Sequence, residues 1–204
     1  MDTEKLEEYF KKFPGIGSRQ AKRFVYFLLT EGGVFAKDLA SLISDLPDKV
    51  FQCSECLRFF QKRNGEKMCD LCSDATRDTK MLLVVEKDID LEMVKKSGVY
   101  AGAFFVLGGL LPILEKNPTK KIRIKELVKK IERTAEKHKL KEIILAFSLN
   151  AEGENTLQYV KKTLEPLSKK EGFTISTLGR GFSTGLELEY SDAETLENAL
   201  KNRS

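Results

Sequence analysis

This sequence of 204 residues lacks the features that would assign it to a membrane or secreted class. It has no tryptophan, only four cysteines and no long uninterrupted apolar run. The longest mostly apolar stretch, residues 101–114, is broken by glycines and a proline and falls short of the ~20 residues that a membrane helix needs. The N-terminal segment MDTEKLEEY is acidic and amphipathic, which does not fit a signal peptide. We therefore expect a cytoplasmic protein without a membrane span.

The chain also has no strong net charge, since its 35 Lys and Arg residues and 31 Asp and Glu residues give a net charge of +4. With 41% apolar and 32% charged residues, the composition is typical of a globular protein, which excludes disorder, collagen and coiled coil as the main architecture. Basic residues are concentrated between Lys116 and Lys141, where apolar residues recur at helical spacing. We interpret this segment as a helix with a solvated basic face, and a nucleic-acid contact there is the alternative.

The cysteines form two C-x2-C pairs, and their members are Cys53, Cys56, Cys69 and Cys72. Two such pairs can direct four thiolates to one point, which is the tetrahedral ligand set that Zn²⁺ prefers. Disulfides or a redox pair are the alternatives, but disulfides are rare in a reducing compartment and a redox pair normally occurs singly. Because four thiolates leave no open coordination position, we predict one structural zinc ion per chain, covered by Phe59 and Phe60.

The N-terminal part predicts two helices joined by a glycine turn. Leu6, Phe10 and Phe13 recur at helical spacing before the break at residues 14–17. Ser18 is the predicted N-cap of the second helix. The segment FPGIGSRQAKRF resembles the helix-hairpin-helix motif of DNA-binding proteins.

Such a hairpin has a physical basis for holding DNA. Its glycines let the backbone approach a phosphate, and the amides at the start of the second helix face that phosphate. Basic side chains on the first turns then pair with neighbouring phosphates, which positions a protein on DNA without reading its sequence. We predict that the DNA-binding residues are Gly15, Gly17, Arg19, Lys22 and Arg23. An ordinary αα-hairpin is the alternative, and the motif can also serve dimerisation.

From residue 81 onward, apolar segments typical of buried strands alternate with helical patterns. We expect strands at residues 81–85, 104–107, 143–147 and 174–178. This alternation predicts a mainly parallel sheet with functional groups at the carboxyl ends of its strands. Acidic residues follow two of these strands, and they are Glu86, Glu152 and Glu154.

The segment 148–154 resembles the acidic motif of topoisomerase-primase (Toprim) domains. In catalytic members of that class, a glutamate and an Asp-x-Asp pair at strand ends bind Mg²⁺ for phosphoryl transfer. Here Ser148 and Asn150 stand at the two aspartate positions. Mg²⁺ is held chiefly by carboxylates, so their loss removes charge that two-metal catalysis needs. We predict a degenerate Toprim fold for which Mg²⁺ is not an expected cofactor; alternatively, Glu152 only stabilises the start of the following helix.

The order of these parts resembles the RecR family of bacterial recombination mediators over essentially the whole chain. The strings that carry the resemblance are FPGIGSRQAKRFVYFLL, CSEC with CDLC, VVE, VLGG, EGENT and LELEY. The resemblance implies a nucleoid-associated repair protein that forms a homo-oligomer, from a dimer to a ring-like tetramer, and binds single- and double-stranded DNA. It also implies action with RecO, and with RecF in some pathways, to load RecA on single strands covered by SSB. Arg19 and Arg23 match the family's DNA-binding positions, and Glu86, Glu152 and Glu154 match the region of its RecO contact.

We thus predict a multidomain α/β protein that holds DNA and presents its Toprim surface to a partner without catalysis. Its predicted parts are a helix-hairpin-helix at 1–50, a four-cysteine zinc module at 51–75, a Toprim domain at 76–170 and a C-terminal assembly segment at 171–204. A Mg²⁺-dependent nuclease or primase-like enzyme that uses the three glutamates is the alternative. A purely protein-binding adaptor without DNA affinity is a third.

Overall fold

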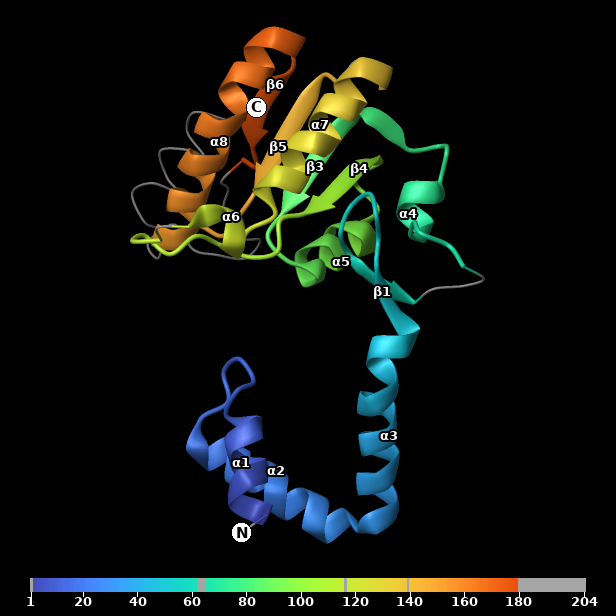
Figure 1. The fold of residues 1–204 in the computed structure, drawn as a ribbon, viewed down its shortest axis with the longest axis vertical. Helices are drawn as coiled ribbons and strands as arrows, with labels where there is room; N and C mark the ends of the chain where they lie inside the picture. Colours follow the sequence, from blue (N-terminus) through green and yellow to red (C-terminus); the bar gives the residue numbers. More distant parts are fainter. Residues whose placement is uncertain (1, 62–64, 116, 139, 180–204) are drawn as a thin grey trace, which may run out of the picture. The chain divides into compact units, whose positions relative to one another are not determined.

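A computed structural model describes residues 2–61, 65–115, 117–138 and 140–179 of the chain (Figure 1). The chain divides into two compact units, residues 1–51 and 52–204. Most of the predicted C-terminal assembly segment, including the string LELEY, lies outside the described residues. None of the helices within the described ranges combines the length and apolarity needed to cross a membrane.

The first unit consists of helices α1 (Asp2–Phe10), α2 (Ser18–Glu31) and α3 (Gly33–Lys49). Ala21 and Val25 on α2 are its buried residues among those described, and the Phe10 ring meets the Phe24 ring edge-on at 5.5 Å. The prediction of Ser18 as N-cap is wrong by one residue. Gly17 takes the extended backbone of the cap position, with φ −86° and ψ 172°, so Ser18 is the first helical residue.

The second unit carries a small two-stranded sheet and a larger α/β layer. Its elements are β1 (Val50–Gln52), β2 (Phe59–Gln61), α4 (Asp70–Ser73), β3 (Asp78–Val85), α5 (Asp88–Ser97), β4 (Gly102–Val106), α6 (Pro118–Lys121), α7 (Ile124–His138), β5 (Glu142–Ala146), α8 (Ala151–Glu171) and β6 (Thr174–Thr177). β1, which begins at the end of the first unit, pairs with β2. The larger sheet has the order β4-β3-β5-β6 with every pair parallel. The predicted α/β class with a parallel sheet is therefore confirmed.

The two faces of this sheet are covered by different elements because successive strand residues point to opposite sides. Leu82 and Val84 of β3 join a cluster with buried residues of α7 and α8. Leu83 and Val85 join a second cluster with Leu91 of α5 and the buried cysteines. Figure 1 shows α7 and α8 packed against the sheet. The cysteines and helix α7 therefore pack against side chains from opposite faces of the sheet, although Glu55 of the cysteine loop forms ion pairs with Lys130 and Arg133 of α7.

The carboxyl ends of the two central strands lie side by side. Val85 is the register partner of Ala146, so the residues that follow them leave the sheet at the same edge. This register brings Glu86 next to the loop that begins at Phe147 and contains Ser148. We call this place, with Glu86, Glu152 and Glu154, the carboxylate edge.

Candidate metal centre and carboxylate edge

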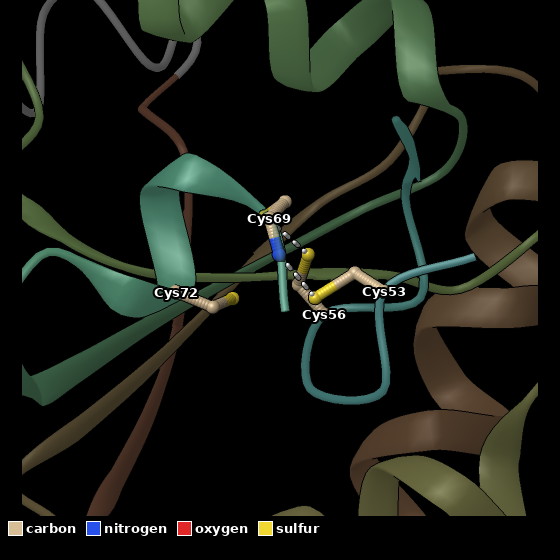
Figure 2. Close-up of side chains that lie close together, drawn as sticks. All are labelled: Cys53, Cys56, Cys69 and Cys72. Carbon is tan, nitrogen blue, oxygen red and sulfur yellow. Dashed lines mark hydrogen bonds between the residues drawn. The ribbon is translucent and has the colours of Figure 1, made fainter. Parts of the chain in front are cut away.

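The four cysteines come together in the folded chain. Their sulfur atoms all lie within 4.8 Å of one another (Figure 2). Cys53 and Cys56 come from the loop between β1 and β2, whereas Cys69 precedes α4 and Cys72 lies on it. Three of the cysteines are buried and Cys72 is half-buried. Four converging thiols, three of them buried, fit a soft divalent cation such as Zn²⁺.

Backbone geometry turns the first cysteine pair toward the second. The amides of Glu55 and Cys69 donate to the Sγ of Cys53 at 3.4 and 3.3 Å. Leu57 has a positive φ of 59°, which lets the chain double back after Cys56. Hydrogen bonds from the other three thiols lower the pKa of Cys53, while the same kind of contact raises the pKa of Cys56. The four thiols therefore do not ionise independently.

The cover of this cluster differs in part from the prediction. Phe60 is buried and packs in the same cluster as the cysteines. Phe59 is 54% exposed, so its predicted role in covering the metal module is wrong. Adjacent residues of strand β2 point to opposite sides, so one of the two rings has to face away.

The cysteine loop is fastened to the larger sheet by Arg123. Its Nη1 donates to the carbonyl oxygens of Leu57 at 2.9 Å and of Val106 at 3.2 Å. The amide of Val106 donates in turn to the carbonyl oxygen of Cys56 at 2.8 Å. These bonds connect the second half of the first C-x2-C pair to the end of β4.

At the carboxylate edge, Glu86 is a buried acid with two partners from its own chain. It is 3% exposed, and the hydroxyl of Ser148 donates to its Oε2 at 2.7 Å. The ammonium of Lys87 pairs with its Oε1. Burial alone would raise the pKa of Glu86, but the bonds from Lys87 and Ser148 outweigh it and hold that pKa below its usual value.

The second aspartate position of the Toprim motif is also engaged within the chain. Asn150 is the N-cap of α8, and its Oδ1 accepts from the amide of Gly153 at 2.8 Å. Gly153 leaves no room for a side chain, because an added Cβ would lie 1.8 Å from the carbonyl oxygen of Ser148. Ser148 and Asn150 therefore support the local structure of the edge.

Glu152 and Glu154 lie in the first turn of α8 and are exposed. Glu154 accepts from the side chain of Gln158 at 2.8 Å. The hydrogen bond with Glu86 and the charge of Glu86 raise the pKa of Lys87 most, and the charges of Asp90 and Glu152 raise it further. The structure thus places one lysine among the predicted acids, which sequence reasoning missed although it directly follows Glu86.

Sequence reasoning also missed two residues that secure the neighbouring loop. The buried hydroxyl of Thr156 accepts from the amide of Leu111 at 2.7 Å and donates to the carbonyl oxygen of Glu152 at 2.6 Å. The side chain of Asn155 donates to the carbonyl oxygen of Leu111 at 3.1 Å. The sequence signal for these contacts was the polar pair Asn155 and Thr156, which directly follows Glu154.

The predicted DNA-binding residues gather around the start of α2. Gly15 has a φ of 76°, which favours glycine, and it lies in the exposed turn before the helix. Arg19, Lys22 and Arg23 are exposed, and the only side-chain bond among them in the described structure joins Arg23 to Gln20 at 3.4 Å. Within the described part of the chain, three cations thus lie near a helix N-terminus without an acidic partner.

Comparison with known proteins identifies the family. A Toprim domain model matches residues 80–179, which include three strands of the larger sheet and all but the first two residues of β3. Recombination protein RecR of Chlorobium phaeobacteroides is 34% identical over 98% of this chain and 95% of its own. The RecR proteins of Chloroherpeton thalassium and Treponema pallidum are each 35% identical, over 99% and 98% of this chain and 96% and 94% of theirs. The chain belongs to the RecR family. In this RecR-family chain, the carboxylate edge lies within the Toprim match.

Proposed function

We propose that this chain is a DNA-binding mediator of recombinational repair that works as a scaffold and not as an enzyme. In this proposal it acts in the cytoplasm, on the nucleoid, with RecO and in some pathways RecF, to load RecA on single-stranded DNA. The hairpin holds DNA, the zinc module supports the fold, the Toprim part presents a partner surface and the C-terminal segment serves assembly.

The non-catalytic assignment rests on one observation, which is that residues at the carboxylate edge are engaged by other groups of the same chain. Phosphoryl transfer by Toprim enzymes needs several carboxylates open to Mg²⁺, which keeps bound waters and demands oxygen ligands. Here Glu86 is occupied by Lys87 and Ser148, and the amide oxygen of Asn150 caps α8. Glu86 and the two residues at the aspartate positions are therefore engaged within the chain, and Lys87 adds a positive charge beside Glu86.

The hairpin supports the DNA-binding part of the proposal. Phosphate contacts need unpaired cations on an exposed surface, and among the described residues Arg19, Lys22 and Arg23 meet that requirement. Gly15 and Gly17 are exposed and carry no side chain between the backbone and a phosphate. Because no base-reading group is involved, the affinity should depend on salt far more than on sequence.

The metal in this proposal is structural zinc. Cys53, Cys56, Cys69 and Cys72 would be its ligands, which closes the coordination sphere. A bound ion would supply the folding energy that a short loop-rich segment cannot obtain from its own core.

Exposed apolar side chains in the first unit support the proposal that the chain associates with itself. Large apolar side chains on α2 and α3 are more than half exposed, including Tyr26, Leu29, Val34 and Leu42. Apolar patches of this kind on a soluble protein mark interaction sites. A second copy of the chain is the occupant that we propose, in a dimer that could extend to a ring-like tetramer.

One experiment separates the scaffold from the Mg²⁺-dependent enzyme. Purified chain is incubated with single- and double-stranded DNA and Mg²⁺ or Mn²⁺, and cleavage and binding are measured together. The scaffold predicts binding without turnover. Cleavage that disappears on Glu86→Gln would falsify it, and absence of DNA affinity at every salt concentration favours the adaptor.

The hairpin is tested by Arg19→Ala with Arg23→Ala. Binding should weaken for all DNA sequences, and the slope of log affinity against log salt should fall by roughly one for each lost phosphate contact. Lys5→Ala with Lys37→Ala removes the same charge from exposed sites on α1 and α3 and serves as the control. Equal affinity and slope in both pairs would assign the hairpin to assembly alone.

The partner surface is tested by Glu152→Lys. Inverting a charge at an exposed position of the carboxylate edge should strongly weaken RecO binding, because charge complementarity governs encounter and register. DNA binding should stay intact or rise slightly, since a repulsive charge is removed. Loss of DNA binding with RecO unaffected would show that this surface is assigned wrongly.

A further inference from the structure

Helices α6, α7 and α8 form a shallow groove on the face of the sheet opposite the cysteines. Its volume is about 410 Å³, and its apolar lining comes from Ile124, Val128 and Tyr159. Ile124 is buried, whereas Val128 and Tyr159 are half-buried, so part of an aromatic ring borders an open apolar surface. We call this place, with Ile124, Lys125, Val128, Lys129 and Tyr159, the α7–α8 groove.

Four basic residues of α7 fall into two sets that differ in their partners. Lys130 and Arg133 turn toward the cysteine loop and share the carboxylate of Glu55, Lys130 at 3.4 Å and Arg133 at 2.5 Å. Lys125 and Lys129 line the groove and are exposed. Neither forms an ion pair with any other described residue.

Additional cations extend this unpaired set beyond the groove itself. Lys120 and Lys121 on α6 are exposed and also form no ion pair within the described chain. Glu132 is the one acid among the described residues that line the groove. An apolar floor with an aromatic ring, bordered by lysines without ion-pair partners in the described chain, suits an occupant that is negative along one side and flat and apolar on the other.

We propose that the α7–α8 groove binds single-stranded DNA, with bases against Tyr159 and the apolar floor and phosphates on Lys125 and Lys129. This second contact rests on the proposed DNA-binding function and lies on a different unit from the hairpin. A single strand fits because its bases are free to stack on side chains, and such stacking is tolerant of sequence. A duplex keeps its bases stacked inside and offers only phosphates to the lysines.

The absence of tryptophan from the chain makes a direct test possible. Tyr159→Trp introduces the chain's only indole at the groove, where a stacked base should quench its fluorescence. Met93→Trp is the control, because this α5 position is 65% exposed and does not line the groove. Both variants are titrated with a labelled oligothymidylate while anisotropy of the label reports total binding.

The charge contribution is tested by Lys125→Ala with Lys129→Ala in the Tyr159→Trp background. Quenching should then require about tenfold more DNA at low salt, and the salt slope should fall by about 1.4, since each single-strand phosphate contact contributes about 0.7. Lys80→Ala with Lys96→Ala removes two exposed lysines elsewhere on this unit and should change neither quantity.

The possible outcomes distinguish a failure of the groove proposal from a failure of the proposed DNA-binding function. If anisotropy reports binding while the introduced indole stays unchanged, the groove proposal is wrong and DNA binding by the hairpin stands. If neither signal responds at any salt concentration, the proposed DNA-binding function fails as well. Equal quenching by a duplex, or quenching by an acidic apolar peptide and not by the oligothymidylate, also overturns the groove proposal.

Discussion

Glu86 is a buried carboxylate whose partners are supplied by the next residue and by one neighbouring loop. Lys87 is 62% exposed at its side chain and Ser148 lies at the first aspartate position of the motif. A buried acid without partners would be costly to keep charged. The arrangement therefore lets the edge retain a charged glutamate without relying on a bound cation.

Lys87→Met tests whether Lys87 stabilises the charged form of Glu86, because that stabilisation should depend on pH. Because the pKa of Glu86 is lowered in the fold, its stabilisation is complete at neutral pH and is lost as the pH falls through that lowered value. The variant should be less stable by about 1 kcal/mol at pH 7, and the difference should narrow below about pH 4. Denaturant unfolding at both pH values measures this, and the pKa of Glu86 by NMR should rise.

Lys96→Met is the control for that substitution, since Lys96 is exposed and forms no ion pair with a described residue. Its stability should match that of the unchanged chain at both pH values. If Lys87→Met behaves in the same way, the ammonium does not stabilise Glu86.

Gly153→Ala should destabilise the second unit by about 1–3 kcal/mol, the usual cost of forcing an extra methyl group into a closed space. The added Cβ would lie 1.8 Å from the backbone oxygen of Ser148, so the loop or the start of α8 has to move. Gly179→Ala is the matched control, because no described atom beyond its chain neighbours lies within 4 Å of the place that an added Cβ would take. Thermal unfolding of both variants measures the effect, and equal midpoints would contradict it.

At the scale of elements, the cysteine loops and α4 form the part that we expect to depend most on metal. Cys69→Ser leaves three thiolates, so the zinc content should fall below one ion per chain and the ion should be lost faster to a chelator. Hydrogen exchange at Phe60, which packs against the cysteines, should accelerate. Metal analysis and exchange rates provide the measurements.

Ser54→Ala is the companion control, since it changes an exposed residue between Cys53 and Cys56 and keeps all four thiols. It should retain a full complement of zinc. Protein purified without a chelator that contains no zinc at all would contradict a structural metal at this site.

Strong periodic patterns let the sequence predict the strands of the larger sheet within a few residues. The run 81–85 lies within β3, and 143–147 overlaps β5 except for its last residue. Residues 82–85 of β3 are buried on both faces of the sheet, and β5 alternates between half-buried and buried residues, so both strands are encoded by apolar runs. Helix α3 was not predicted, although Phe35, Leu39, Leu42 and Leu46 recur at helical spacing and were the available signal.

The candidate site was predictable in its residue types but not in its internal contacts. The spacing of the cysteines indicated their convergence, which local chain geometry largely determines. The pairing of Lys87 with Glu86 was not predictable, because a lysine beside a glutamate in sequence has many exposed orientations. The bond from Ser148 to Glu86 depends on strand register, which joins residues far apart in the chain.

At the scale of the whole molecule, self-association should depend on the exposed apolar residues of α3. Leu42→Glu with Ile43→Glu replaces two residues that are 65% and 56% exposed with charges that an apolar interface cannot accommodate. We expect the solution mass to fall toward the 23.1 kDa of one chain. Light scattering, with and without DNA, measures it.

Ser41→Glu with Ser44→Glu places the same two charges on exposed polar positions of α3 and should leave the mass unchanged. Dissociation by both pairs would attribute the effect to added charge and not to apolar contact. A mass of one chain for the unchanged protein would contradict self-association through this helix.

Arg123 connects the cysteine loop to the start of the basic helix α7. Its guanidinium holds the Leu57 carbonyl beside the cysteines, and its amide donates to the carbonyl of Leu107 at 2.9 Å just before α7 begins. A ligand that restrains α7 should therefore also restrain the metal loop, and linkage requires each to change the other's affinity by the same factor. If the groove binds single-stranded DNA and the cysteines bind zinc, DNA should lower the fraction of zinc that a chelator removes at equilibrium, so that the metal content of the protein reports its occupancy on DNA.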